Sequence, residues 1–182
     1  LNLPSDLQYK AAFRIRLEGT LPEPLGKIAV DPLNLYLRGA DEFPAMIYEQ
    51  ILGKRVALVI QAPEQRGKTL AVLPRDSVRR VGFAEDEALL PPSPRSFEGY
   101  RLLREYFAFP QRYLFVGLHG LAAGLKQCTG RQVDLVIALS EADTRLENRV
   151  NASAFELFCA PVINLFSKTL DRISLSQRFS EF

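Results

Sequence analysis

The residues of this chain that could do chemistry are few. His119 is the only histidine in the sequence, which removes most ways of building a zinc site or a Ser–His–Asp triad. Cys128 follows at short distance, so a thiol activated by this imidazole is the one nucleophilic pair to consider. A packed thiol and a turn histidine explain the same two residues without catalysis. We therefore expect no catalytic residue.

Two other motifs lack the context that their chemistry needs. Gly67, Lys68 and Thr69 spell the end of a phosphate-binding loop, but the required earlier glycine is alanine and a strand follows where the motif needs a helix. The carboxylates at 85–87 diverge in space if they share one helical turn, which indicates a solvated helix start and no metal site. The sequence thus predicts no metal and no cofactor.

Two groups of residues are candidates for contact with a protein partner. Asn164 lies in an apolar run, where it either fixes a turn through side-chain hydrogen bonds or precedes an exposed apolar patch formed by Leu165 and Phe166. A second, loosely basic group could face an acidic partner or simply be solvated; it contains Arg75, Arg79 and Arg80.

Composition places the chain among globular proteins. Its hydrophobic share of 47% and charged share of 24% are average, and no apolar run approaches the roughly 20 residues of a membrane-spanning helix. A net charge of +2 does not argue for nucleic acid, which needs a clustered basic face. Two cysteines make no disulfide framework and favour a reducing compartment.

The apolar and polar pattern of the sequence predicts mainly short strands, and these strands position the residues named above. Phe13, Ile15 and Leu17 alternate with polar residues, and two successive strands of this kind favour an antiparallel sheet with one wet face. The most apolar strand, 132–139, should be central. The expected strands are 11–18, 33–37, 55–61, 69–73, 113–118, 132–139 and 154–159, with further candidates at 75–83 and 172–182.

Two helices are predicted, at about 42–52 and 96–108. For the first, Asp41 can serve as N-cap and Gly53 as the left-handed terminal residue. In the second, four large apolar side chains recur at three- or four-residue steps, so we expect that face to be buried against the sheet as the hub of the core. These four residues are Phe97, Tyr100, Leu103 and Phe107.

These elements indicate an α+β, β-dominated fold: an antiparallel β-sandwich-like domain with two covering helices. We expect one domain over residues 1–182, with a possible internal boundary in the proline-rich stretch 90–95. Strand order does not follow from the pattern.

Two motifs resemble one known family. The aromatic helix ends in REYFAFP (104–110) and is followed by YLFVGL (113–118), while FELFCAPVINLF (155–166) ends in an Asn-Leu-Phe triplet. Together they are similar to TssF (VasA/ImpG-like), a baseplate subunit of the bacterial type VI secretion system. Because members of that family are several times longer, the resemblance implies an excised middle portion.

The resemblance also implies a role. It is that of a structural wedge component in a contractile injection machine, with no bond chemistry and no cofactor. The implied partners are TssG, TssK, TssE and the spike protein VgrG, in a cytoplasmic complex docked at the inner membrane, with no nucleic acid and no insertion into the membrane.

Two alternatives remain open. A β-sandwich module for a carbohydrate or small ligand would expose a row of aromatics, whereas here the rings fall in a helix register that we expect to be buried. An enzyme would need Cys128 and His119 to converge.

Overall fold

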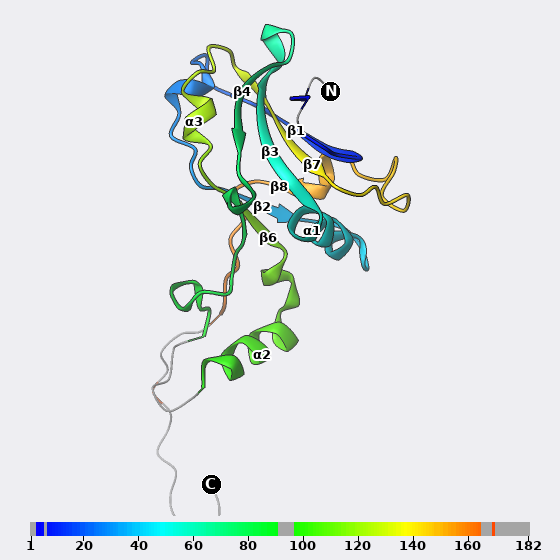
Figure 1. The fold of residues 1–182 in the computed structure, drawn as a ribbon. Helices are drawn as coiled ribbons and strands as arrows, with labels where there is room; N and C mark the ends of the chain where they lie inside the picture. Colours follow the sequence, from blue (N-terminus) through cyan, green and yellow to red (C-terminus); the bar gives the residue numbers. More distant parts are fainter. Residues whose placement is uncertain (1–2, 6, 91–96, 165–168, 170–182) are drawn as a thin grey trace, which may run out of the picture.

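Two four-stranded antiparallel sheets form the body of the molecule (Figure 1). The structure is a computed structural model that describes residues 3–5, 7–90, 97–164 and 169. The first sheet has the order β1 (Ala11–Glu18), β7 (Gln132–Leu139), β3 (Arg55–Ala62), β4 (Lys68–Leu73). The second has the order β5 (Val78–Arg80), β6 (Phe115–Leu118), β2 (Leu33–Leu37), β8 (Phe155–Glu156). The predicted α+β fold of antiparallel strands is confirmed.

Three α-helices accompany the sheets: α1 (Phe43–Gly53), α2 (Glu98–Ala108) and the short α3 (Ala122–Leu125). Of the two helices predicted from the sequence, α1 packs as a covering helix, through Ile47 and Ile51, which are fully buried in the main core. α2 lies away from both sheets (Figure 1), so the prediction of two covering helices is wrong for this one.

The alternating pattern located several strands correctly. β1, β2 and β7 have the predicted bounds, and β7 is central because it pairs with β1 on one side and β3 on the other. β3 and β4 form the predicted hairpin, in which Gly67 takes φ +72°. The Gly-Lys-Thr triplet is therefore a turn that leads into a strand.

Other strands are shorter than predicted. The candidate at 75–83 contains a strand only at Val78–Arg80, and β6 begins at Phe115 because residues 110–113 form a 3-10 turn. β8 covers two residues of the predicted 154–159. β1 and β2 lie in different sheets, and both sheets are antiparallel. The candidate at 172–182 lies outside the described residues.

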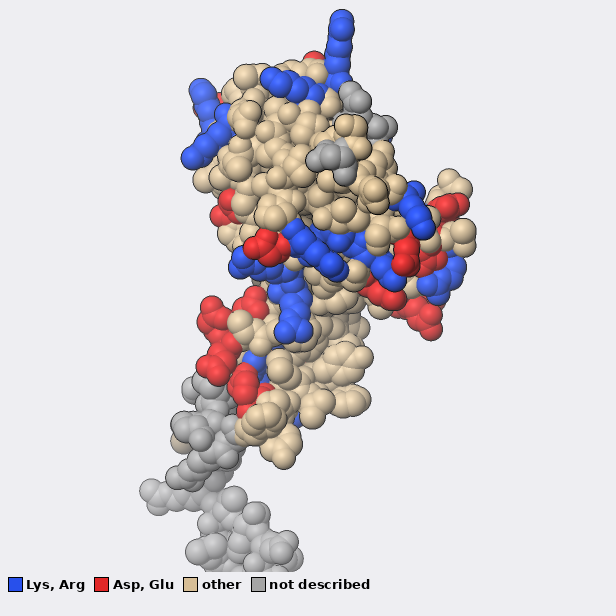
Figure 2. Space-filling model, viewed as in Figure 1, with Lys and Arg blue, Asp and Glu red and all other residues tan. Residues whose placement is uncertain are grey.

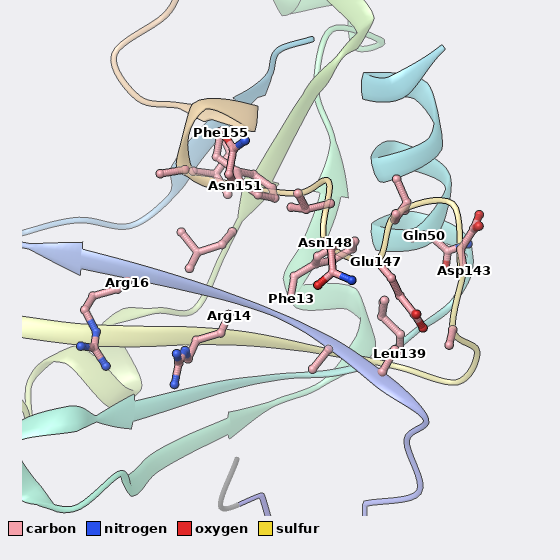
Figure 3. Close-up of a pocket in the computed structure, with 18 of the residues that line it drawn as sticks. Phe13, Arg14, Arg16, Gln50, Leu139, Asp143, Glu147, Asn148, Asn151 and Phe155 are labelled. Atoms are coloured by element: carbon pink, nitrogen blue, oxygen red, sulfur yellow. The ribbon is translucent and has the colours of Figure 1, made fainter. Parts of the chain in front are cut away.

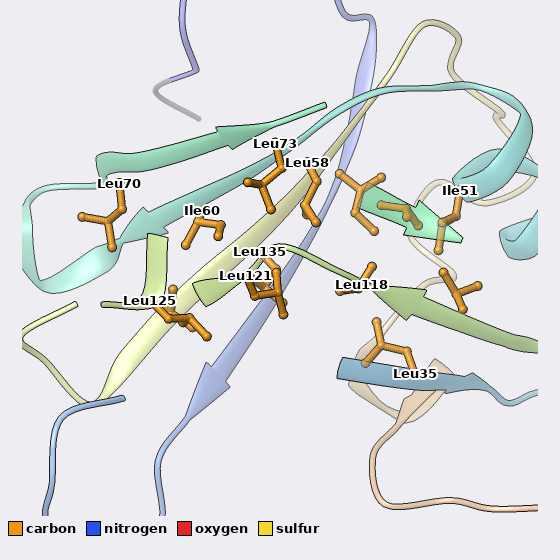
Figure 4. Close-up of a cluster of buried hydrophobic side chains, with 14 of the residues drawn as sticks. Leu35, Ile51, Leu58, Ile60, Leu70, Leu73, Leu118, Leu121, Leu125 and Leu135 are labelled. Atoms are coloured by element: carbon orange, nitrogen blue, oxygen red, sulfur yellow. The ribbon is translucent and has the colours of Figure 1, made fainter. Parts of the chain in front are cut away.

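The core fills the space between the two sheets (Figure 4). Leu35 and Leu118 project from the second sheet and Leu58 and Leu135 from the first, and all four are fully buried. Burying each such side chain contributes about 1.5–3 kcal/mol. This shared interior explains why two small sheets form one body.

The ends of α1 differ from the predicted caps. Glu42 is the N-cap residue without a side-chain hydrogen bond, and Asp41 has φ +53°. Gly53 remains helical. Arginines bind the C-terminal carbonyls instead: Arg55 Nη1 donates to Ile51 O at 2.7 Å and Arg75 Nη2 to Gly53 O at 3.1 Å. Positive charges at the C-terminal end also interact favourably with the helix dipole.

The segment between β5 and β6, residues 82–114, projects from the body and carries α2; we call it the arm (Figure 1). It begins at Gly82, where φ is +99°, and continues through a 3-10 turn at Glu85–Glu87. The predicted boundary at 90–95 falls almost entirely outside the described residues. Whether the whole sequence is one domain stays a prediction.

Candidate interaction surface

Most large apolar residues of α2 face solvent, as does Phe97 just before the helix. Phe97 is 72% exposed, Tyr100 61%, Leu103 55% and Phe107 81%. We call these four side chains, together with Tyr106 at 53%, the aromatic face. The prediction that the four residues of the periodic stripe anchor the helix to a sheet is therefore wrong. The helical period identified the stripe correctly but not the side on which it lies.

The buried side of α2 is charged. Arg101 and Glu105, one turn apart, are 7% and 3% exposed, and Arg112 beyond the helix is 1% exposed. Glu105 forms ion pairs with both arginines; the Arg101 Nη1 to Glu105 Oε2 distance is 3.1 Å. These three residues, with the Tyr113 hydroxyl that also donates to Glu105 Oε2 at 3.3 Å, are called the ionic cluster.

The ionic cluster ties α2 to the loop that enters the arm. Glu105 Oε1 accepts the backbone N–H groups of Leu89 and Leu90, both at 3.0 Å. Arg112 Nη2 donates to the carbonyls of Gly82 at 2.8 Å and Glu87 at 2.7 Å. One carboxylate and one guanidinium thus satisfy four backbone groups of the stretch 82–90.

Burial and pairing oppose each other in this cluster. Burial lowers the pKa of Arg112, yet an arginine remains charged because its ordinary pKa is far above neutrality. The carboxylate of Glu105 compensates that charge, and losing one member of a buried pair typically costs about 3–5 kcal/mol. In the part of the chain that the structure describes, α2 packs mainly against the 3-10 turn Pro110–Tyr113 and the loop that enters the arm, so one side of the helix is buried. Because Arg101 and Glu105 must lie on the buried side of α2, the helix is oriented with its aromatic rings toward solvent.

The aromatic face continues into a groove between α1 and α2. The groove has a volume of about 750 Å³ and is rich in rings, among them Tyr36, Tyr48, Phe83, Tyr106 and Tyr113. Burial raises the pKa of Tyr48, so its phenol stays neutral. Figure 2 shows one side of the arm free of charge and the other side lined by Asp and Glu, while Lys and Arg gather near its junction with the body. The arrangement suits apolar side chains of a protein.

The basic group predicted from the sequence is exposed near the junction between body and arm. Arg75 caps α1, Arg79 Nε donates to Asp76 O at 3.0 Å, and Arg80 lies 4.6 Å from the ring centre of Phe83. Asn164 is exposed, but Leu165 and Phe166 lie outside the described residues. Contact of these residues with a partner stays a prediction.

The cysteine–histidine hypothesis finds no support in the geometry. Cys128 is buried, and its thiol donates to the carbonyls of Gly130 and Gln132 at 3.5 Å each. Among the described residues, no three His, Cys, Asp or Glu side chains gather as a metal site would require. Within the same part of the chain, none of the helices has the length and apolar character to cross a bilayer.

The sequence reasoning missed the ionic cluster and Tyr106. A signal was present: Arg101 and Glu105 stand four residues apart, the spacing of a helical ion pair, but such pairs are usually solvated. Nothing local shows that Arg112, beyond Pro110, completes the pair.

Comparison with known proteins assigns a family. The family described as "Type VI secretion system, TssF" matches residues 2–182. The type VI secretion system component TssF1 of Pseudomonas aeruginosa PAO1 is 45% identical over 177 residues, which are 97% of this chain and 28% of that protein. A chain of a cryo-electron microscopy structure of the TssK-TssF-TssG baseplate subcomplex has a TM-score of 0.69 and 25% identity, covering 91% of this chain and 30% of that one. This chain therefore spans less than a third of each relative.

Proposed function

Since the chain belongs to the TssF family of the type VI secretion system, we propose that it is a structural part of the baseplate that docks to other subunits through the aromatic face. The solved relative lies in a subcomplex with TssK and TssG, so these two are the proposed partners. The observation that carries the proposal is a stripe of exposed rings whose supporting helix is held from behind by the ionic cluster.

The physical case rests on what exposed rings contribute. Aromatic side chains dominate binding energy at protein interfaces because they bury much area and lose little conformational freedom. Phe107 at 81% exposure and Phe97 at 72% leave most of their surface to be covered. The ionic cluster restrains the helix before binding, which reduces the entropy lost on association.

The test uses full-length protein co-expressed with TssK and TssG. Replacing Tyr100 and Phe107 together by alanine should weaken the complex about 100-fold, since a ring at the centre of an interface contributes roughly 1–2 kcal/mol. Val72→Ala is the matched control, because Val72 is an exposed apolar residue on β4, in the body. Undiminished recovery of both partners with the double variant would contradict the proposed docking face.

Further contacts belong to the same proposal. TssE and VgrG are proposed neighbours in the assembled baseplate, and the proposed location is a cytoplasmic complex docked at the inner membrane. Crosslinkers placed at Arg79 and Asn164, both exposed, test whether the groups predicted from the sequence lie at a subunit boundary. Crosslinks confined to this protein itself would exclude them.

A carbohydrate-binding role is the second candidate, because the rings that the sequence analysis expected to be buried are exposed. The groove beside Tyr48 and Tyr106 could stack against a sugar. A panel of glycans should leave the melting temperature unchanged if the baseplate role is correct. Stabilisation by one glycan that is abolished in Tyr106→Ala would favour the second role.

A further inference from the structure

A second cavity runs along β1, on the body (Figure 3). It has a volume of about 690 Å³ and lies between β1 and the chain segment that includes residues 142–157. Its walls are mainly apolar, with contributions from Ile15, Leu17, Leu35, Leu146 and Phe155. We call it the edge groove because it follows the outermost strand of the first sheet.

β1 offers free backbone groups to the edge groove. It pairs with β7 alone among the strands of the described residues. Gly19 N donates to Arg131 O at 2.8 Å in the same register as β1 and β7, so odd-numbered residues of β1 point their amides and carbonyls toward β7. The amides and carbonyls of Ala12, Arg14 and Arg16 therefore point away from the sheet, and all three residues line the groove.

A buried polar side chain also lacks a partner at this place. Gln50 of α1 lines the edge groove and is only 7% exposed, yet its Oε1 accepts no hydrogen bond. An unsatisfied buried acceptor costs about 1–3 kcal/mol, which a donor from a bound molecule would offset. This is an observation independent of the strand edge.

We propose that the edge groove binds an extended segment of a partner baseplate subunit, which pairs with β1 as a fifth strand of the first sheet. Outward amides of β1 supply hydrogen bonds spaced two residues apart, and alternate side chains of the segment enter the apolar groove. The partner's identity rests on the proposed function. The surface itself is separate from the aromatic face.

The edge groove carries charge of both signs: Arg14 and Arg16 lie on β1, and Asp143 and Glu147 line it from the loop after β7, so an acidic group of the bound segment is expected only beside β1. Arg14 and Arg16 are exposed along β1, and Asp134 engages only part of Arg16, at 2.7 Å from Nε and 2.9 Å from Nη2. A second copy of this chain pairing through its own β1 would bring arginines against arginines, which is unfavourable. A segment with alternating apolar residues and a carboxylate facing Arg14 complements the edge.

The experiment is amide hydrogen exchange on the full-length protein, alone and in complex with TssK and TssG. The amides of Ala12, Arg14 and Arg16 should exchange quickly in the free protein and at least 100-fold more slowly in the complex. Arg14→Pro removes one outward N–H and keeps the bonds to β7, so it should lower recovery of the complex at least tenfold. Arg14→Ala removes the same side chain but keeps the N–H, so it should lower recovery clearly less than Arg14→Pro does; equal losses would contradict pairing through this amide.

Three other results would each contradict the inference, and they can be told apart. Fast exchange at these amides in an assembled complex would leave the proposed function intact and remove the edge groove as a binding site. Slow exchange already in the free protein would assign the groove to a segment of the same polypeptide. Failure of the unaltered protein to bind TssK and TssG would overturn both proposals.

Discussion

The body and the arm solve the same packing problem in opposite ways. In the body, leucine, isoleucine and valine fill the space between the sheets, and most charged side chains, such as Arg14 and Arg16, remain outside, with Arg55 and Asp134 as buried exceptions. In the arm, Arg101, Glu105 and Arg112 are inside and the rings of α2 are outside. Burial therefore depends on residue type and also on how many surfaces are available for a side chain to pack against.

The arm has too little structure to form an apolar interior. α2 packs against loops whose backbone N–H and C=O groups need partners, and charged side chains meet that need better than rings do. The body has two sheets whose own ladders satisfy the backbone, so its interior can be apolar.

The largest effect on the arm is expected from Glu105→Gln. It leaves Arg101 and Arg112 buried beside each other without the carboxylate, and we expect the arm to lose about 3–5 kcal/mol. Hydrogen exchange of α2 should accelerate while β3 and β7 stay protected. Arg104→Gln, at an exposed position on the same helix, serves as control. Equal acceleration in the body would show that arm and body unfold as one unit.

The converse change is Leu135→Ala in the centre of β7. Leu135 is fully buried, and a leucine-to-alanine cavity of this kind costs about 3 kcal/mol. Here the exchange of β3 and β7 should accelerate, and urea denaturation measures the loss. A cost below 1 kcal/mol would mean that the interior of the body is packed loosely around Leu135.

A smaller effect is expected for Phe107→Ser. Because the ring is 81% exposed, unfolding free energy should change by less than about 0.5 kcal/mol, although binding of an apolar dye should fall. Thermal unfolding of the isolated protein checks the first expectation. A large loss of stability would indicate that the aromatic face packs against another part of the full-length chain.

The smallest effect concerns Asp143, on the loop after β7. Arg145 donates hydrogen bonds to this carboxylate from its side chain and its backbone, which lowers the pKa of Asp143. The resulting stability is present above the ordinary pKa of about 4 and is lost as the pH falls through the lower folded value. Asp143→Asn should therefore melt slightly lower at pH 7 and equal the unaltered protein at acid pH. A constant difference across that range would exclude the linkage.

The sequence predicted the body well because alternation reports directly on a strand with one wet face. The residues of β1 and β7 show this, and the central position of β7 follows from its uniformly apolar run. Strand order did not follow, since β1 and β2 look alike in sequence and belong to different sheets.

The arm could not be predicted in the same way. A stripe such as Tyr100, Leu103 and Phe107 has the same spacing whether it faces a core or a partner, and the interior of the arm depends on Arg112, which lies outside the helix. Burial of charge depends on contacts between segments that are distant in the sequence. Helix propensity and hydrophobic periodicity are local and do not predict such contacts.

The way in which the arm joins the body has a mechanical consequence. The arm leaves from the end of β5 and returns at the start of β6, and these neighbours are antiparallel, with Arg80 opposite Val116. Tension on the tip would pull both strands in the same direction and load the ladder between β6 and β2 in shear. Arg112, which clasps Gly82 and Glu87, ties the two legs of the arm together ahead of that ladder. The arm would thus transmit load to the second sheet as one piece.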